Sequence, residues 1–271
     1  MPARYPERIV CLTEETTETL YLLGEERRIV GISGYTVRPA RARKEKPRVS
    51  AFLSARNDAI LALAPDLVLG FSDLQADIGR DLAKAGLNVM LFNQRSIEEI
   101  LSMILVLSSI VGAVARGEQL VGRLEGHLAE VRRSAARLPR RPRVYFEEWD
   151  EPMISAIRWV SELIAIAGGD DVFAAKSRCH AASGRVVTSE EVIAKSPELI
   201  IGSWCGKKFR PERVAARPGW QAVPAVKAKQ LHEVKSSEIL QPGPAALTDG
   251  VRRLHAIIAG AGASASPPGA R

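Results

Sequence analysis

Residues 143–173, RVYFEEWDEPMISAIRWVSELIAIAGGDDVF, predict a strand, an acidic and aromatic loop, and then a helix. The strand is expected at residues 144–147. The helix is expected because apolar side chains recur at i, i+3, i+4 and i+7 before a glycine stop: Val160, Leu163, Ile164, Ala167 and Gly168. Ligands of open α/β sheets sit beyond the carboxyl ends of strands, so the loop from Glu148 to Trp159 is the first candidate site.

Strands and helices alternate along the whole chain. Strands are predicted at residues 8–12, 29–32, 49–53, 67–70, 89–92, 186–187, 199–202 and 231–234. Helices are predicted after Thr13, an expected N-cap, and at residues 57–63, 77–85, 190–195 and 245–259. Two helices follow residue 92 without a strand between them. The second, at 113–138, has one apolar stripe: Leu120, Leu124, Leu128, Val131, Ala135 and Leu138.

The chain contains an internal repeat. NDAILALAPDLVLG at 57–70 and SEEVIAKSPELIIG at 189–202 match element for element, at an offset of 132 (189 − 57). Each begins with an expected N-cap followed by an acid, Asp58 or Glu190. We therefore predict an α/β fold of two Rossmann-like lobes with mainly parallel sheets, joined by one long backbone helix. The predicted domains are an N-terminal lobe (1–112), a connecting helix and linker (113–142), a C-terminal lobe (143–262) and a disordered tail (263–271).

Composition excludes several classes of protein. The 271 residues are 46% hydrophobic, enough for a large core, and the net charge of +7 is spread along the chain without a basic stripe, which argues against nucleic acid. No apolar run is long enough to enter a bilayer. Three unevenly spaced cysteines, Cys11, Cys179 and Cys205, indicate neither a disulfide framework nor a zinc site. No signal peptide is recognised, so we expect a cytoplasmic protein, or a periplasmic one if a leader precedes this sequence.

Several blocks resemble a known family. They are RIVCLTEETTETLYLLG, VGISGY, AILALAPDLVLG, FEEWDEPMI, WVSELIAIAGGDDVF and SEEVIAKSPELIIGSW, and their order covers residues 7–260. The chain resembles the class III, helical-backbone substrate-binding proteins of ABC importers, in the branch that binds cobalamin and iron complexes.

The resemblance implies a ligand held between the lobes and no required cofactor. The ligand would be a corrinoid, haem or metal chelate. It would be touched by the loop at residues 13–16, by the stretch 236–241 that includes Ser237, and by the aromatic positions Tyr35, Phe52, Phe71 and Trp149 with Glu148. Asp58 and Glu190 match the two carboxylates that dock the family's proteins onto an ABC permease. A cytoplasmic effector is the alternative partner.

Further residues are candidates from the sequence itself. The loop GSWCGKKFRPE at 202–212 follows a strand, so Trp204, Cys205 and Lys207 are expected at the mouth of the cleft, where Lys207 would receive an anionic group. Arg158 and Trp159 close the first candidate loop, and Glu14 and Glu15 follow the first strand. Each of these candidates also has a structural interpretation that stays open. Glu14 and Glu15 could be ordinary acids of a first helical turn, the loop 202–212 could be a basic surface loop over a buried Trp, and Cys205 could be a packing residue.

The preferred hypothesis is a ligand-binding protein whose groove is walled by Glu14, Tyr35, Trp149 and Trp204. The bound molecule would be a cobalamin-like ligand, haem, an iron chelate or another polar ligand. One alternative is an enzyme similar to metal chelatases, for which His180 is the candidate histidine. The other is an ordinary periplasmic importer component.

Overall fold

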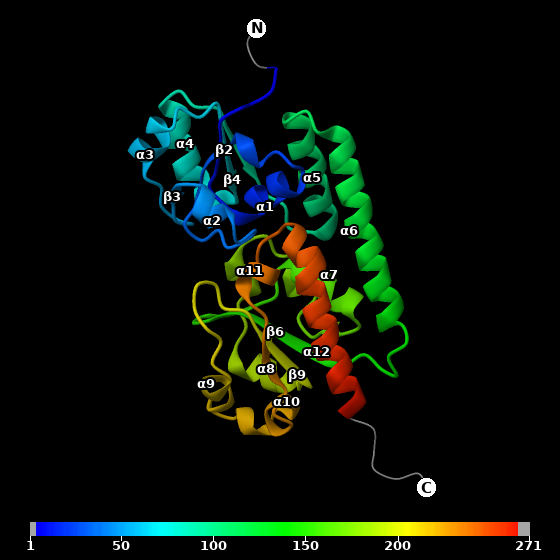
Figure 1. Ribbon diagram of the computed structural model, residues 1–271. Coiled ribbons are helices and arrows are strands. Elements are labelled where there is room, and N and C mark those ends of the chain that lie inside the picture. Colours follow the sequence, from blue (N-terminus) through cyan, green and yellow to red (C-terminus); the bar gives the residue numbers. More distant parts are fainter. Residues whose placement is uncertain (1–3, 265–271) are drawn as a thin grey trace. The chain divides into compact units, whose positions relative to one another are not determined.

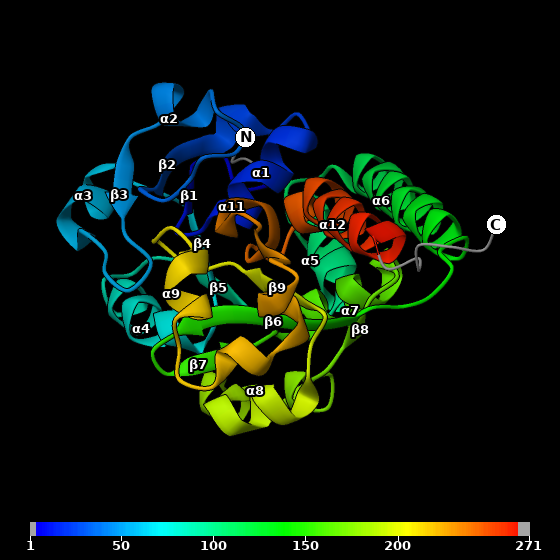
Figure 2. The same ribbon diagram turned by 90° about the horizontal axis from the view of Figure 1, so that it is seen from below.

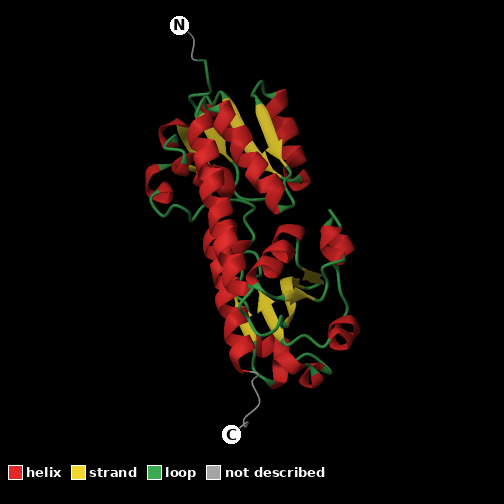
Figure 3. Ribbon diagram, turned by 90° about the vertical axis from the view of Figure 1, so that its right-hand side faces the viewer, coloured by secondary structure: helices red, strands yellow, loops and turns green. Residues whose placement is uncertain are grey.

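The computed structural model describes residues 4–264, and these residues form two compact units (Figure 1). The first unit contains the chain up to Gln94 together with Glu98–Leu124. The second contains Arg95–Ile97 and the chain from Glu125 onward. Each unit is an α/β structure with helices packed around its strands (Figure 3). The α/β fold with two largely parallel sheets is confirmed.

The first unit is a parallel sheet with the strand order β3-β2-β1-β4-β5. Its strands are β1 (Ile9–Cys11), β2 (Ile29–Ser33), β3 (Arg48–Ser50), β4 (Leu67–Phe71) and β5 (Val89–Phe92). Its helices are α1 (Glu14–Leu22), α2 (Ala42–Glu45), α3 (Asn57–Ala62), α4 (Ala76–Lys84) and α5 (Ile97–Ile110). The strand order reverses between β1 and β4, and in doubly wound sheets that switch point is where ligands bind.

The second unit is centred on β6 (Arg143–Asp150), and its strand order is β10-β9-β6-β7. Its other strands are β7 (Met153–Ser155), β8 (Asp170–Asp171), β9 (Leu199–Gly202) and β10 (Leu231–Glu233). Its helices are α7 (Arg158–Ala167), α8 (Ser189–Lys195), α9 (Pro211–Ala215), α10 (Pro224–Lys227), α11 (Ser236–Ile239) and α12 (Val251–Ser264). Figure 2 gives a second view of these strands with α7 and α8. Strands β8, β9 and β10 run parallel to their neighbours, and β7 alone among the described strands of this unit pairs antiparallel.

Two local predictions were wrong. Glu148, Trp149 and Asp150 do not form a loop: they extend β6, which turns back into β7 as a hairpin. Residues 186–187 do not form a strand, since Val186 makes only an isolated bridge to Ile154. The hairpin puts Trp149 and Asp150 on a hydrogen-bonded strand, which fixes them more firmly than a loop would.

The long helix α6 (Val114–Ala135) is part of both units: its residues up to Leu124 belong to the first and those from Glu125 to the second. Its predicted stripe is buried at Leu120, Leu124, Leu128, Val131 and Ala135. Among the described residues, 4–264, no helix is long and apolar enough to cross a membrane. α12 runs to residue 264, so the first two residues assigned to the tail are helical, and the rest of the tail, 265–271, lies outside the described residues.

The repeat extends to backbone geometry. The residue between α3 and β4, Ala64, has a positive φ of 43°, and the residue between α8 and β9, Ser196, has a φ of 45°. The offset is again 132 (196 − 64), and a proline follows each residue. Left-handed backbone strains a residue that carries a Cβ, so both halves keep the same costly turn.

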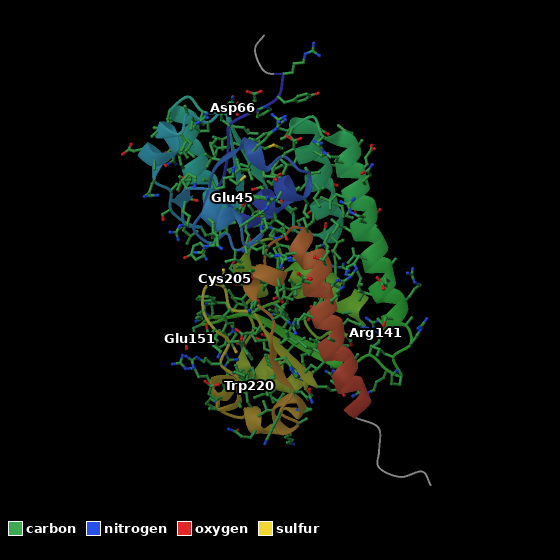
Figure 4. The ribbon with its side chains drawn as sticks, viewed as in Figure 1. Glu45, Asp66, Arg141, Glu151, Cys205 and Trp220 are labelled. Atoms are coloured by element: carbon green, nitrogen blue, oxygen red, sulfur yellow. The ribbon has the colours of Figure 1, made fainter. Side chains whose placement is uncertain are left out.

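The same turn is held by matching side chains. Arg8 donates to the carbonyl oxygens at the end of α3 (2.6–3.1 Å), and Arg143 donates to the carbonyl at the end of α8. The Asp66 carboxylate, labelled in Figure 4, accepts the backbone N–H groups of Glu7 (2.7 Å) and Arg8 (3.0 Å). Glu198 accepts the N–H of Arg143 (2.9 Å). An arginine and an acid thus join a helix end to the start of two strands in each unit.

The expected N-caps of α3 and α8 were wrong by one residue. The cap positions are Arg56 and Thr188, and Thr188 forms a full capping box with Glu191. Asp58 and Glu190 therefore lie at the second helical position, where a carboxylate is still favoured by the helix dipole.

We predict that Ala64→Gly raises the free energy of unfolding by about 0.5–1 kcal/mol, because glycine adopts the left-handed turn without a Cβ clash. Urea denaturation measures the change. The matched control is Ala83→Gly, an exposed site inside α4, which should lower stability by about 1 kcal/mol. Equal destabilisation by both variants would show that the turn at Ala64 is not strained.

Candidate functional site

The carboxyl edge of the first sheet carries exposed apolar side chains. Tyr35 follows β2 and is 57% exposed, Leu53 follows β3 and is 68% exposed, and Leu74 follows β4 and is 60% exposed. We call these three residues the apolar rim. Exposed apolar surface that gathers at one functional edge of a domain is typical of a binding surface.

Gln75 fixes two aromatic segments beside this rim. Its buried side chain donates to the carbonyl oxygen of Phe52 (2.9 Å) and accepts the N–H of Phe71 (3.0 Å). A Cβ on Gly70 would lie 2.7 Å from the Gln75 side-chain oxygen, so a larger residue there would displace Gln75 from its two hydrogen bonds. Phe52 is half-buried and Phe71 is buried. Gln75 is a site residue that the sequence analysis missed.

The acids of α1 face inward. Glu14 is buried and accepts the backbone N–H groups of Val37 (2.8 Å) and Arg38 (3.1 Å), which holds the segment that follows Tyr35. Thr13 occupies the N-cap position, but its hydroxyl donates to Glu15 (2.5 Å) instead of capping the helix. Burial raises the pKa of both Glu14 and Glu15 to about 7. Thr13 is therefore at the expected N-cap position, but its side chain does not make the capping hydrogen bond.

These raised pKa values predict a pH-dependent stability. In the unfolded chain a glutamate ionises near pH 4.5, whereas folded Glu15 keeps its proton to about pH 7. The contribution of Glu15 to the free energy of unfolding therefore falls as the pH rises from about 4.5 to about 7. We expect Glu15→Gln to be more stable than the parent at pH 8, on the order of 2 kcal/mol, and similar to it at pH 4.5. Urea midpoints at several pH values measure this.

The matched control is Glu118→Gln, an exposed site on α6 that removes the same charge. A pH profile of Glu15→Gln that runs parallel to the profile of the parent would contradict the inward-facing, protonated acid.

In the second unit Glu147 is fully buried and both of its oxygens are occupied. One accepts from the Trp204 indole (3.1 Å) and from Arg217 (3.0 Å), and the other from the Tyr145 hydroxyl (3.0 Å) and from Arg217 (2.5 Å). Burial, and next the nearby Glu147 charge, hold the pKa of Tyr145 well above its ordinary value. Arg217 also stacks over Trp220, labelled in Figure 4, with 4.7 Å from its guanidinium carbon to the ring centroid.

Glu148 points away from Glu147, as strand alternation predicts. It forms a bidentate ion pair with Arg185, whose Nη1 lies 2.5 Å and whose Nη2 lies 3.1 Å from its oxygens. A fifth of the Glu148 side chain, 20%, is exposed. The carboxylate expected to meet a ligand is thus already neutralised by an arginine.

Lys207 is likewise paired within the unit. Its ammonium contacts the carboxylate of Asp150 and lies 4.0 Å from the ring centroid of Trp149 and 5.2 Å from that of Trp204. The Trp149 indole also donates to the carbonyl of Glu151 (2.9 Å). Lys207 therefore has a carboxylate partner within its own unit, and its ammonium holds Trp149 at the edge of the sheet by cation–π contact. Its expected role as a receiver of anionic groups stays a prediction.

The other predicted residues are dispersed. Trp159 is buried and its indole donates to the carbonyl of Ile239 (2.9 Å), so it is a core residue and not a ligand contact. Arg158 pairs with Glu162 along α7. Cys205, labelled in Figure 4, is exposed on the loop after β9, and Ser237 is half-buried in α11.

The remaining candidate acids are on the surface. Asp58 and Glu190 are both exposed in the first turns of α3 and α8. The backbone N–H of Glu190 and the Thr188 hydroxyl lower the pKa of Glu190. His180 is exposed, and within residues 4–264 no three His, Cys, Asp or Glu side chains gather as a metal site.

Sequence reasoning missed Asp150, Arg185 and Arg217 as partners of the candidate residues. Their pairings join residues 37 to 70 positions apart, which no local pattern reveals. The apolar rim could have been found, because Leu53 is the last residue of one predicted strand and Leu74 lies four residues beyond another.

Two α/β units that share one helix, each with aromatic side chains at the carboxyl edge of its sheet, define a ligand-binding protein of the substrate-binding type. The chain belongs to the periplasmic binding protein family, whose model matches residues 9–238.

Relatives and solved structures agree with this assignment. The chain is 25% identical over 259 residues to an uncharacterized ABC transporter substrate-binding lipoprotein, YvrC, of Bacillus subtilis, covering 92% of this chain and 79% of the relative. It is 26% identical over 223 residues to the vitamin B12-binding protein of Yersinia pestis, covering 80% and 75%. The periplasmic heme-binding protein RhuT of Roseiflexus has the same fold, with a TM-score of 0.76, 24% identity, and coverage of 93% and 99%. These relatives are named as binding proteins and not as enzymes.

Proposed function

We propose that this protein binds a cobalamin-like ligand, haem or an iron chelate at the carboxyl edges of its two sheets and works with an ABC permease. The observation that carries the proposal is the apolar rim beside the switch point of the first sheet. Similarity to proteins named for binding vitamin B12 and heme supports the same ligand class.

The rim suits a large and partly apolar ligand. Its three side chains are each more than half exposed, and covering such surface contributes about 25 cal/mol per Å². The half-buried Phe52 beside it is fixed through Gln75, so a ligand would meet it without reordering the chain. A small hydrophilic solute could not cover this rim.

In the second unit Trp149 is the proposed contact. Its ring is half-buried and held by the Glu151 carbonyl and the Lys207 ammonium. An indole fixed in this way offers a flat face at a low entropic cost, which suits a planar macrocycle.

We predict that Tyr35→Ala, Leu74→Ala and Trp149→Ala each weaken ligand binding about tenfold or more, because each removes contact area that only the ligand covers. Native mass spectrometry and thermal shift with cobalamin, haem and ferric siderophores select the ligand, and calorimetry measures its affinity.

The matched controls are Leu22→Ala and Leu105→Ala, which remove exposed apolar side chains of the first unit away from its carboxyl edge. They should leave affinity unchanged. Failure of the unmodified protein to bind any member of the panel would overturn the proposed function.

We further propose that Asp58 and Glu190 contact the permease. They occupy equivalent positions of the repeat, one in each unit, and both are exposed at helix starts. Neither acid is part of the capping box that Thr188 forms with Glu191, although the helix dipole favours an acid at either position.

The double variant Asp58→Asn/Glu190→Gln is expected to bind ligand normally and to lower stimulation of the permease's ATPase in proteoliposomes by about tenfold, because two charge pairs are lost. Glu98→Gln, another exposed first-turn acid, is the control. Unchanged stimulation of the ATPase by the double variant would show that neither acid contacts the permease.

The proposed partner also determines in which cellular compartment the protein should be found. A partner permease requires a position at the outer face of the membrane, whereas a cytoplasmic protein would deliver its ligand to a cytoplasmic effector. Fractionation of native cells with an antibody against this chain separates the two.

A further inference from the structure

The segment that follows β2 has almost no apolar anchor. Residues 35–46, YTVRPARARKEK, lie between β2 and β3 and include the short helix α2. Its buried residues are Thr36 and Ala42, whereas Tyr35 at its start is 57% exposed. Five of its residues are basic and one is acidic: Arg38, Arg41, Arg43, Lys44, Lys46 and Glu45. We call residues 35–46 the strap.

Two acids of α1 hold the first half of the strap. Glu14 accepts the backbone N–H groups of Val37 (2.8 Å) and Arg38 (3.1 Å). Glu18, one turn further along α1, accepts from the Arg38 guanidinium (2.9 Å). The side chains of this ion pair are 31% exposed for Arg38 and 10% exposed for Glu18. This half is therefore attached by charge and hydrogen bonds at the surface of the unit.

A third acid holds the second half. Glu26, in the 3-10 turn η1 (Glu26–Arg28), accepts from the Arg41 guanidinium (2.8 Å), which also lies over the Tyr21 ring, 4.7 Å from its centroid. The Tyr21 hydroxyl donates to Glu45 (2.7 Å), which is labelled in Figure 4. The side chains of Arg41 and Glu26 are 55% and 29% exposed, so water and salt reach this contact.

The two ends of the strap are attached in a different way. Just before the strap, the Gly34 N–H donates to the carbonyl of Ser50 in β3 (2.7 Å). Just after it, the Pro47 carbonyl accepts the N–H of Ile32 in β2 (2.9 Å). Backbone hydrogen bonds of the sheet thus fix both ends, whereas the middle is held mainly by charges.

These two kinds of attachment differ in strength. Ion pairs that are partly exposed contribute little to stability, and salt screens them. A segment with few buried apolar contacts opens locally at a low free energy while the rest of the fold stays closed. The strap should therefore be able to leave α1 without unfolding β2 or β3.

We propose that the strap detaches from α1 and η1 as one piece, between ends that stay on the sheet, and thereby moves Tyr35 into and out of the apolar rim. Glu14 holds the strap two and three residues after Tyr35, so the ring keeps its place on the rim only while the strap is attached. Detachment is a property of the free protein, whereas its effect on a ligand rests on the proposed function.

Hydrogen exchange of the full chain, at about 20 mM and about 500 mM sodium chloride, tests detachment, because the screening length falls from about 20 Å to about 4 Å. We expect the N–H groups of Val37 and Arg38 to exchange about fivefold or more faster at the higher salt, since detachment separates them from Glu14. The internal control is the N–H of Phe71, which the neutral side chain of Gln75 accepts. Its exchange should not depend on salt.

The double variant Arg38→Gln/Arg41→Gln removes both guanidinium contacts with the acids. At low salt its Val37 and Arg38 N–H groups should exchange about as fast as those of the parent do at high salt, and should lose most of their response to salt. The matched control is Arg43→Gln/Lys44→Gln, which removes the same charge from exposed residues of α2 that make no ion pair within residues 4–264. It should exchange like the parent.

A ligand should act in the opposite direction to salt. Whichever of cobalamin, haem or a ferric siderophore binds should slow exchange at Val37 and Arg38, because it favours the attached strap. The double variant Arg38→Gln/Arg41→Gln should bind it about threefold more weakly than the parent, since a less populated binding-competent state lowers the apparent affinity.

Equal exchange of the Val37 and Arg38 N–H groups at both salt concentrations, or in both double variants, would overturn the strap and leave the proposed function intact. A ligand that binds Arg38→Gln/Arg41→Gln as tightly as the parent would show that the strap does not position Tyr35, which also overturns the inference. Failure to bind any member of the panel would overturn the proposed function, whereas exchange in the free protein still decides detachment.

Discussion

The turn between a helix and the next strand is the constraint on which each unit depends. A chain that leaves α3 or α8 and enters a buried strand within a few residues must satisfy the last helix carbonyls and the first strand N–H groups at once. Both units solve this with one arginine on the carbonyls and one acid on the N–H groups, around a residue with positive φ. Because Arg8 directly precedes the central strand β1 and Arg143 is the first residue of the central strand β6, the same contact also aligns each sheet.

That alignment decides what appears at the opposite, carboxyl edge. With the strands in register, Tyr35, Leu53 and Leu74 emerge beyond three neighbouring or near-neighbouring strands of the first sheet. The acids beside them turn inward onto backbone N–H groups or hydroxyls. In the second sheet Glu147, Glu148 and Asp150 each take a cation from their own unit. The charged side chains that suggested a polar, anion-binding pocket are therefore paired with partners inside their own unit. The side chains that remain for a ligand at the carboxyl edges are apolar and aromatic.

The sequence predicted the elements well where a single pattern dominates. β5 and β9 have the expected bounds, because a short buried apolar run between a glycine or proline and a polar loop has few other outcomes. The repeat also located α3 and α8 in matching positions. β7 was missed because Met153–Ser155 is short and shows no alternation, so only its pairing with β6 makes it a strand.

The candidate site was less predictable for a physical reason. Trp149 and Trp159 were both assigned to the first candidate loop, yet one lies at the sheet edge and the other donates to a carbonyl 80 positions away in the core. Lys207 resembles a free cation in its basic loop, and only the fold brings Asp150 to it. Local patterns fix where a strand ends, whereas the partner that neutralises a side chain there comes from distant sequence.

The buried ion pair of Glu147 and Arg217 shows how contacts between distant parts of the sequence hold side chains at the carboxyl edge of the second sheet. Burying both charges costs several kcal/mol, which their attraction offsets only when every oxygen and N–H is well placed. Here the Trp204 indole and the Tyr145 hydroxyl complete the set, so the pair holds Trp204 in one orientation. Trp204 and Trp149 together flank the Lys207 ammonium. The position of Trp149 at the sheet edge thus depends, through four contacts, on Arg217, which lies 70 positions along the chain from the carboxylate that it neutralises. An apolar pair in the same place would fill the volume, but it would leave the Trp204 N–H unpaired and Trp149 without its support.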